Sequence, residues 1–111
     1  HRIVRKGKMI ISGGENIYPS EVEGVLGAHP KVKDVAVVGV PHDKWGEAVH
    51  AIVVLHHDTE ATEDELVDWC RGRIAGYKRP QGVRFIADAE MPRTATGKIL
   101  HRALRDRMAA A

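Results

Sequence analysis

The stretch Val32-Lys33-Asp34-Val35-Ala36-Val37-Val38-Gly39-Val40 decides the fold of this chain. Valine fills five of its nine positions, and β-branched residues favour strands. After a turn-forming loop at 41–46, the stretch 47–55 alternates apolar side chains onto one side of a pleat. We therefore expect two long strands, Val32–Val40 and Glu47–Leu55, within one small sheet.

A short strand and a helix are expected on the N-terminal side of these strands. Met9–Ile11 is a short apolar run that ends at the glycine-containing turn Ser12-Gly13-Gly14. Proline suits the first turn of a helix, so a helix is expected to begin at Pro19. Gly27 and Pro30 are expected to end it.

Two helices and a further strand are expected on the C-terminal side. Thr62 caps a helix predicted over 63–75, and Glu65 completes a capping box with it. Residues 82–87 predict a third main strand, and the apolar spacing of 99–108 predicts a last amphipathic helix. The chain is therefore expected to be α+β, with a small sheet of about three main strands, a short N-terminal hairpin, and helices packed on the sheet.

Composition is typical of a small globular domain. The 111 residues suit one domain, and a net charge of +2 with only five aromatic residues argues against nucleic-acid binding. The single cysteine, Cys70, excludes an internal disulfide, fits a reducing, cytoplasmic compartment, and is expected to be a packed thiol. No stretch has the length of a transmembrane segment, and the seven histidines lack metal-ligand spacing, so no metal held by this chain is expected.

Lys98 is the strongest candidate for a chemical role. It follows Gly97 on a turn rich in threonine and glycine, just before the last helix, where its ammonium group suits an anionic ligand. The turn is not a phosphate-binding Walker A loop, because Pro92 replaces the first glycine and Ile99 replaces the final serine or threonine. From these residues alone, a solvated surface lysine remains the alternative.

Three separated parts of the chain together resemble one family. Residues 8–23, with Ser12-Gly13-Gly14-Glu15 at their centre, are similar to the segment that enters the C-terminal domain of acyl-CoA synthetases. Residues 35–47 resemble the central strand and following loop of that domain, and residues 77–80 and 92–99 resemble its closing motifs. The order and spacing also agree, so the chain is identified as a member of the adenylate-forming superfamily.

The resemblance implies a two-step reaction in a larger enzyme. A carboxylic acid attacks the α-phosphate of ATP, supplied with Mg²⁺, and coenzyme A then displaces AMP to give a thioester. Residues 1–8 would be an interdomain hinge remnant, and residues 9–111 the mobile C-terminal domain, which closes on an N-terminal adenylation domain absent from this chain. The abrupt start at His1 also suggests a fragment, which alone would be inactive.

The resemblance also assigns roles to individual residues. Lys98 would be the lysine of the adenylation step, bridging the carboxylate and the α-phosphate. Gly13, Gly14 and Glu15 would face the active site in the second step, with Gly14 lining the tunnel for the pantetheine arm of coenzyme A; a simple turn is the alternative for Gly13. Arg79 would bind coenzyme A phosphates.

The remaining assignments are less specific. Lys78 and Arg84 are further candidates for the phosphates, and exposed solubilising charge is the alternative for both, as it is for Arg79. Arg5 matches an arginine that contacts the nucleotide, and Lys8 matches the hinge, although many relatives carry aspartate there. Trp45 is expected to pack in the core, with contact to the adenine of coenzyme A as the alternative.

Two other functions stay open at this point. The chain would be a non-catalytic binding or dimerisation module if its exposed face now binds a second copy, giving a homo-oligomer. It would be the lid of a different adenylating enzyme if the acceptor were a carrier protein. The identity of the carboxylic acid lies outside the chain.

Overall fold

The computed structural model of the chain describes residues 9–110. Five strands, three α-helices and two short 3₁₀ helices follow one another in this part of the chain. Their bounds in order are β1 (Ile10–Ser12), β2 (Glu15–Ile17), α1 (Pro19–Gly27), β3 (Val32–His42), β4 (Gly46–Leu55), α2 (Glu63–Trp69), η1 (Gly76–Lys78), β5 (Gly82–Phe85), η2 (Asp88–Glu90) and α3 (His101–Ala110).

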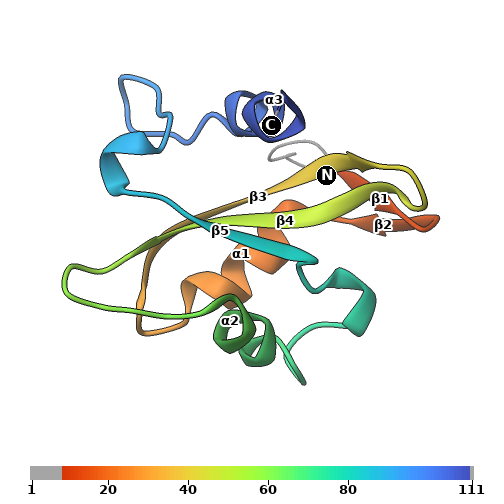
Figure 1. Cartoon of the computed structure of the whole chain (residues 1–111), viewed down its shortest axis with the longest axis horizontal. Coiled ribbons are helices and arrows are strands. Elements are labelled where there is room, and N and C mark those ends of the chain that lie inside the picture. Colours follow the sequence, from red (N-terminus) through yellow and green to blue (C-terminus); the bar gives the residue numbers. More distant parts are fainter. Residues whose placement is uncertain (1–8, 111) are drawn as a thin grey trace, which may run out of the picture.

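The two long valine-rich strands form the centre of the sheet, as predicted. β3 and β4 pair antiparallel from Asp34↔Val54 to His42↔Gly46. The other side of β4 is shared, because β5 pairs with it in parallel and the hairpin β1–β2 meets it at Ser12↔Gly46. β3 pairs with β4 alone among the described strands, so it is one of the edge strands of the sheet (Figure 1).

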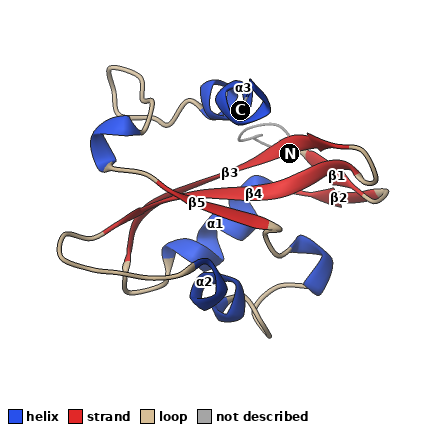
Figure 2. Cartoon of the chain, viewed as in Figure 1, coloured by secondary structure: helices blue, strands red, loops and turns tan. Residues whose placement is uncertain are grey.

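Helices cover both faces of this sheet, so the predicted α+β class is confirmed. Side chains alternate along β3 and β4. One set, including Val37 and Ala51, joins the core under α1 and α2, and the other set, including Val38 and Ile52, packs with Leu104 under α3. Figure 2 shows α1 and α2 on one side of the sheet and α3 on the other. The loop before α3 therefore lies on the same side of the sheet as α3, opposite α1 and α2.

Helix α2 is shorter than predicted. It ends at Trp69 rather than near Ala75, and a series of turns follows in which Gly72 has φ +77°. Glycine tolerates this left-handed backbone, which a helix cannot continue through. Ile74 still packs against the core from these turns, and Cys70 is fully buried as expected, so burial raises the pKa of its thiol.

The predicted cap of α2 is confirmed at Thr62. The Thr62 hydroxyl accepts a hydrogen bond from the Glu65 backbone N–H at 3.1 Å. The Glu65 carboxylate lies 3.0 Å from Lys31 Nζ, and the hydrogen bond to Lys31 is the main reason that its pKa is lowered, with a smaller contribution from the Thr62 backbone. Across residues 9–110 no helix combines the length and apolar character needed to cross a bilayer.

Candidate functional site

The segment 92–100 forms a closed loop that ends at α3. Thr94 N–H donates to the Lys98 carbonyl at 2.8 Å, and Leu100 N–H donates to the Pro92 carbonyl at 2.9 Å. Arg93 and Ile99 face each other in a single β-bridge, so α3 begins at His101 and not at Ile99 as predicted. Periodicity predicted too early a start because Ile99 packs on the core from an extended backbone.

Lys98 lies on the exposed side of this loop. Its backbone N–H donates to the Thr94 hydroxyl at 3.1 Å, and that hydroxyl also meets the Thr96 hydroxyl at 3.0 Å. Gly97 has φ +93°, which turns the chain just before the lysine. Within residues 9–110, no carboxylate forms an ion pair with Lys98, so its positive charge is left facing outward.

One end of the loop is anchored by Arg93. Its Nη2 donates to Asp34 Oδ2 at 2.6 Å and to Asp88 Oδ1 at 3.0 Å, which joins the loop to β3 and to η2. Lys33 Nζ lies 3.1 Å from Asp88 Oδ2, and the hydrogen bonds from Lys33 and then Arg93 lower the pKa of Asp88. The two carboxylates nearest the loop base are therefore engaged by cations other than Lys98.

The other end of the loop is anchored by His101, a contact that sequence reasoning missed. His101 Nε2 lies 2.6 Å from Glu23 Oε2 of α1, and this carboxylate also accepts from Val37 N–H of β3 at 2.8 Å. The hydrogen bond to Glu23 raises the pKa of His101 above 6.5. No local spacing signals this pair, since its residues stand 78 positions apart.

The glycine pair proposed for the second step forms the β1–β2 turn. Gly13 has φ +59° and Gly14 has φ +83°, a two-residue turn that glycine tolerates best. Gly13 N–H donates to the Trp45 carbonyl at 2.9 Å, so the turn is fixed against the β3–β4 turn. A Cβ added at Gly14 would meet no atom within 4 Å, and Glu15 beside it is exposed.

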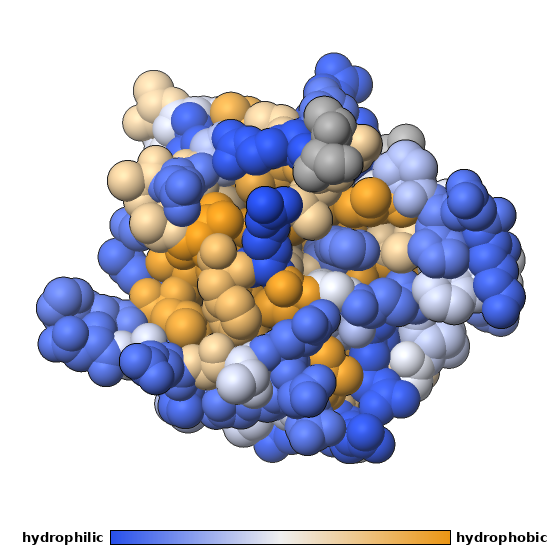
Figure 3. All heavy atoms as spheres, viewed as in Figure 1, coloured by the Kyte–Doolittle hydropathy of each residue, from blue (hydrophilic) through white to orange (hydrophobic). Residues whose placement is uncertain are grey.

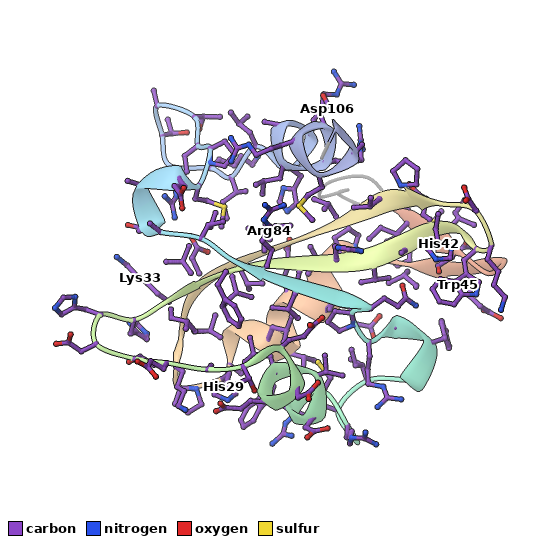
Figure 4. The ribbon with its side chains drawn as sticks, viewed as in Figure 1. His29, Lys33, His42, Trp45, Arg84 and Asp106 are labelled. Carbon is purple, nitrogen blue, oxygen red and sulfur yellow. The ribbon has the colours of Figure 1, made fainter. Side chains whose placement is uncertain are left out.

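Trp45 does not enter the core as expected. Its ring stacks on His42 with centroids 4.2 Å apart, and both residues are only partly buried (Figure 4). The reason is local, because the tryptophan lies in the tight turn between β3 and β4, beyond the helices that cover the sheet. The pair instead forms a rigid support beside the glycine turn.

The loop at 92–100 and the glycine turn lie at opposite ends of the domain. Figure 1 shows the loop before α3 at the upper left and the β1–β2 turn at the far right. The structure therefore does not bring Lys98 together with Gly13 and Gly14. Lys98 and the glycine pair instead lie on two different faces of the domain.

The other basic candidates differ in how far they are engaged. Lys78 is held by Glu21 at 2.9 Å, and that contact raises its pKa. Arg79 folds back toward the Gly76 carbonyl at 3.4 Å, and none of the ion pairs among residues 9–110 includes it. Arg84 lies on β5 and donates to Met108 Sδ at 3.4 Å. Arg5 and Lys8 lie outside the described residues.

Two surface hollows in the described part of the chain lie beside β5. A hollow of about 430 Å³ is bordered by Lys33, Phe85 and Asp88, and another of about 230 Å³ lies between β5 and α3. Figure 3 shows apolar atoms gathered over this region of the sheet. Neither hollow includes Lys98 or Gly14, and residues 9–110 hold no group of three metal-ligating side chains.

Comparison with known proteins gives one consistent result. The model of the family described as "AMP-binding enzyme C-terminal domain" matches residues 21–98. The chain is 50% identical over 102 residues to the long-chain-fatty-acid–CoA ligase FadD13 of Mycobacterium tuberculosis, covering 92% of the chain and 20% of that protein. It is 48% identical to a feruloyl-CoA synthase of Amycolatopsis, covering 96% of the chain and 21% of that protein.

Solved structures agree with this result. A fatty acyl-CoA synthetase of Mycobacterium tuberculosis superposes with a TM-score of 0.84 at 48% identity, covering 92% of this chain and 20% of that one. The o-succinylbenzoate-CoA synthetase of Bacillus subtilis, in complex with its acyl-adenylate intermediate, gives 0.80 at 45% identity, covering 88% of this chain and 19% of that one. The chain thus spans about a fifth of the length of these relatives.

Proposed function

Because this chain belongs to the family of AMP-binding enzyme C-terminal domains of acyl-CoA ligases, we propose that it acts as the mobile C-terminal domain of an ATP-dependent acyl-CoA synthetase. It works with an N-terminal adenylation domain, which holds most of the ATP and acid sites. Residues 1–8 are the hinge remnant of that enzyme, with Lys8 at the hinge and Arg5 near the nucleotide. Without the larger domain the chain is inactive.

In the first half-reaction, a carboxylate oxygen bonds to the α-phosphorus of ATP and pyrophosphate leaves. Both reactants are anionic, so their approach is opposed by charge repulsion. Lys98 offsets this repulsion by donating to the carboxylate and to the α-phosphate as charge shifts between them. The observation that carries this role is the exposed, unpaired ammonium group on a loop anchored at both ends within residues 9–110.

In the second half-reaction, the coenzyme A thiol attacks the acyl carbon and AMP leaves. We assign this step to the opposite end of the domain, where Gly13, Gly14 and Glu15 face outward. The open space beyond Gly14 leaves room for a narrow pantetheine arm. Arg79 supplies a cation for the phosphates of coenzyme A, a role for which Lys78 is less suited because Glu21 already holds it.

A coenzyme A acceptor is favoured over a carrier protein. The relatives reported above are named as CoA ligases and synthases, and they match over nearly the whole chain. The alternative of a non-catalytic dimerisation module has no specific support, since the lysine loop is anchored as a catalytic loop would have to be.

The Lys98 assignment is tested with Lys98→Ala in the enzyme that joins this domain to its adenylation domain. Adenylation, followed as pyrophosphate release, is expected to fall by about 100- to 1,000-fold, the usual effect of removing one group that stabilises a transition-state charge. Thioester formation from supplied acyl-AMP is expected to stay close to wild type. Lys44→Ala removes an exposed lysine from the β3–β4 turn and serves as the control for adenylation. An equal loss in both half-reactions would contradict the assignment.

A further inference from the structure

We propose that Glu23 of α1 is a positioning residue for Lys98 and that it acts through His101. The proposal rests on the function assigned to Lys98 above, and it adds a residue that lies outside the loop and on another helix. Its geometric basis is the 2.6 Å contact between His101 Nε2 and Glu23 Oε2.

The contact links three layers of the domain. Glu23 projects from α1 on one face of the sheet, and His101 projects from the first turn of α3 on the other face. The same Glu23 oxygen accepts from Val37 N–H, which belongs to the edge strand β3. The carboxylate therefore fixes the start of α3 relative to the sheet edge.

His101 transmits this restraint to the lysine loop. It follows Lys98 by three residues, and its ring also hydrogen-bonds to the backbone of Ile99. Arg93 ties the opposite end of the loop to Asp34, which belongs to the same strand β3. Both ends of the loop are thus held to one strand, and Lys98 lies between them.

The strength of the contact between Glu23 and His101 depends on whether the His101 imidazole is protonated. A charged imidazole donates from both ring nitrogens, so it satisfies Glu23 and Ile99 together, whereas a neutral ring has only one N–H. His101 also borders a hollow of about 20 Å³, where the other charged groups in the described chain are Glu47 of β4 and Arg105 of α3, while β3 contributes Val37, Val38 and Gly39. Glu23 makes the closest contact, so it dominates the raised pKa of His101.

The sign of the pH effect follows from this direction. Because folding raises the pKa of His101, the stabilisation from the pair is fully present below pH 6.5 and is lost as the pH rises through the folded-state pKa. The restraint on the lysine loop is therefore strongest below pH 6.5 and weakens as the pH rises through the folded-state pKa of His101.

NMR on the 111-residue chain tests the proposal without any assumption about catalysis. In the wild type, the His101 ring and the amides of 97–100 are expected to titrate together, at a pH above 6.5. Glu23→Gln is expected to move the His101 pKa toward 6.5, to remove that titration from the loop amides, and to lower their heteronuclear NOE values. Glu21→Gln, the same change on the same helix, is the matched control and should leave all three unchanged, since Glu21 contacts Lys78. Methyl shifts of Val37 and Leu104 report that each variant is folded.

Two outcomes would overturn the proposal. One is a His101 pKa that Glu23→Gln does not lower, which would mean that the pair is absent in solution. The other is a lowered His101 pKa with loop amides and NOE values that stay as in the wild type, which would mean that Arg93 alone holds the loop.

Kinetics of the joined enzyme separate this proposal from the proposed function. Glu23→Gln is expected to lower kcat of adenylation by about 10- to 100-fold through misplacement of Lys98, with little change in KM for ATP. His101→Arg, which keeps a positive charge at every pH, is expected to retain more activity than Glu23→Gln at a pH above the folded-state pKa of His101. Suppose that Lys98→Ala has no effect on adenylation while Glu23→Gln changes the His101 pKa and the loop amides as expected. The proposed function then fails, but the restraint of the loop by Glu23 and His101 is supported. If Lys98→Ala abolishes adenylation and Glu23→Gln leaves kcat unchanged, the positioning role fails.

Discussion

Near the base of the Lys98 loop, two acidic side chains are paired with cations other than Lys98. Within residues 9–110, Asp34 and Asp88 pair with Arg93, and Asp88 also pairs with Lys33. A lysine that is neutralised by a neighbouring carboxylate would offer less attraction to an anionic reactant. Arg93 therefore anchors the loop and neutralises two carboxylates at its base.

Arg93→Met tests this residue-level argument. The variant keeps an apolar stem but leaves the carboxylates of Asp34 and Asp88 without their shared partner, so the loop is expected to move and Lys98 to gain acidic neighbours. Adenylation should fall by about 10- to 100-fold in kcat, and Arg93→Lys should restore part of the loss. Arg71→Met removes an exposed arginine paired with Asp68 and is the control. Wild-type adenylation by Arg93→Met would contradict the anchoring role.

Individual residues were predictable only where a local pattern marks them. The Pro92–Lys98 segment points to Lys98, and Thr62 marks the cap of α2, which the structure confirms. Glu23 and His101 carry no such mark, because their contact depends on how α1 and α3 pack around the edge of the sheet. The proposed roles of Gly13, Gly14, Glu15 and Arg79 remain predictions, as do those of Arg5 and Lys8.

At the scale of elements, the β-branched runs determined most of the fold. The strands β3 and β4 lie where valine and alternation predict them, each with one set of side chains in each core. The helix ends were less predictable. Helix α2 stops early at turns containing Gly72, and α3 starts late because Ile99 is held in a bridge to Arg93. Both differences come from backbone geometry that apolar periodicity does not report.

Gly39 connects β3 to the N-terminal hairpin, and its replacement tests that packing. A Cβ at Gly39 would lie 2.9 Å from Glu47 Oε2 and 3.1 Å from Ile10 Cγ1. Glu47 Oε1 accepts from Ile11 N–H at 2.8 Å, so displacing this side chain also disturbs β1. Gly39→Ala is expected to destabilise the domain by about 1–3 kcal/mol, a typical cost of overpacking, measured by chemical denaturation.

Gly24→Ala is the same glycine-to-alanine change at another site, and it is expected to stabilise the domain. Gly24 lies exposed in α1, where an added Cβ meets no atom within 4 Å. Alanine is the better helix former, so this variant should gain about 0.5–1 kcal/mol. Equal effects of the two variants would show that the contact between Gly39 and Glu47 does not constrain the hairpin.

At the scale of the whole molecule, the structure separates the two loops that the family resemblance assigns to different steps. Motif order indicates the family, but it does not say that the lysine loop and the glycine turn lie at opposite ends of the sheet (Figure 1). That arrangement requires the register of β3 and β4 and the docking of the β1–β2 turn on Trp45. It gives the domain two distinct faces.

Gly14→Asn addresses the second of these faces. Asparagine tolerates the positive φ of Gly14 better than other side chains, so the turn should persist while the added atoms obstruct the pantetheine arm. Thioester formation is expected to fall by at least about tenfold, with adenylation close to wild type. Gly72→Asn, at φ +77° and also free of neighbours within 4 Å, is the control for the cost of a side chain at such a backbone.

The two separate faces are tested most directly by rapid-quench measurement of both half-reactions for Lys98→Ala and Gly14→Asn in the same joined enzyme. We expect a crossed pattern, in which Lys98→Ala slows acyl-AMP formation alone and Gly14→Asn slows its conversion to the thioester alone. If both variants slowed the same half-reaction, or if each slowed both to the same degree, the claim that this domain serves the two steps with two separate faces would be contradicted.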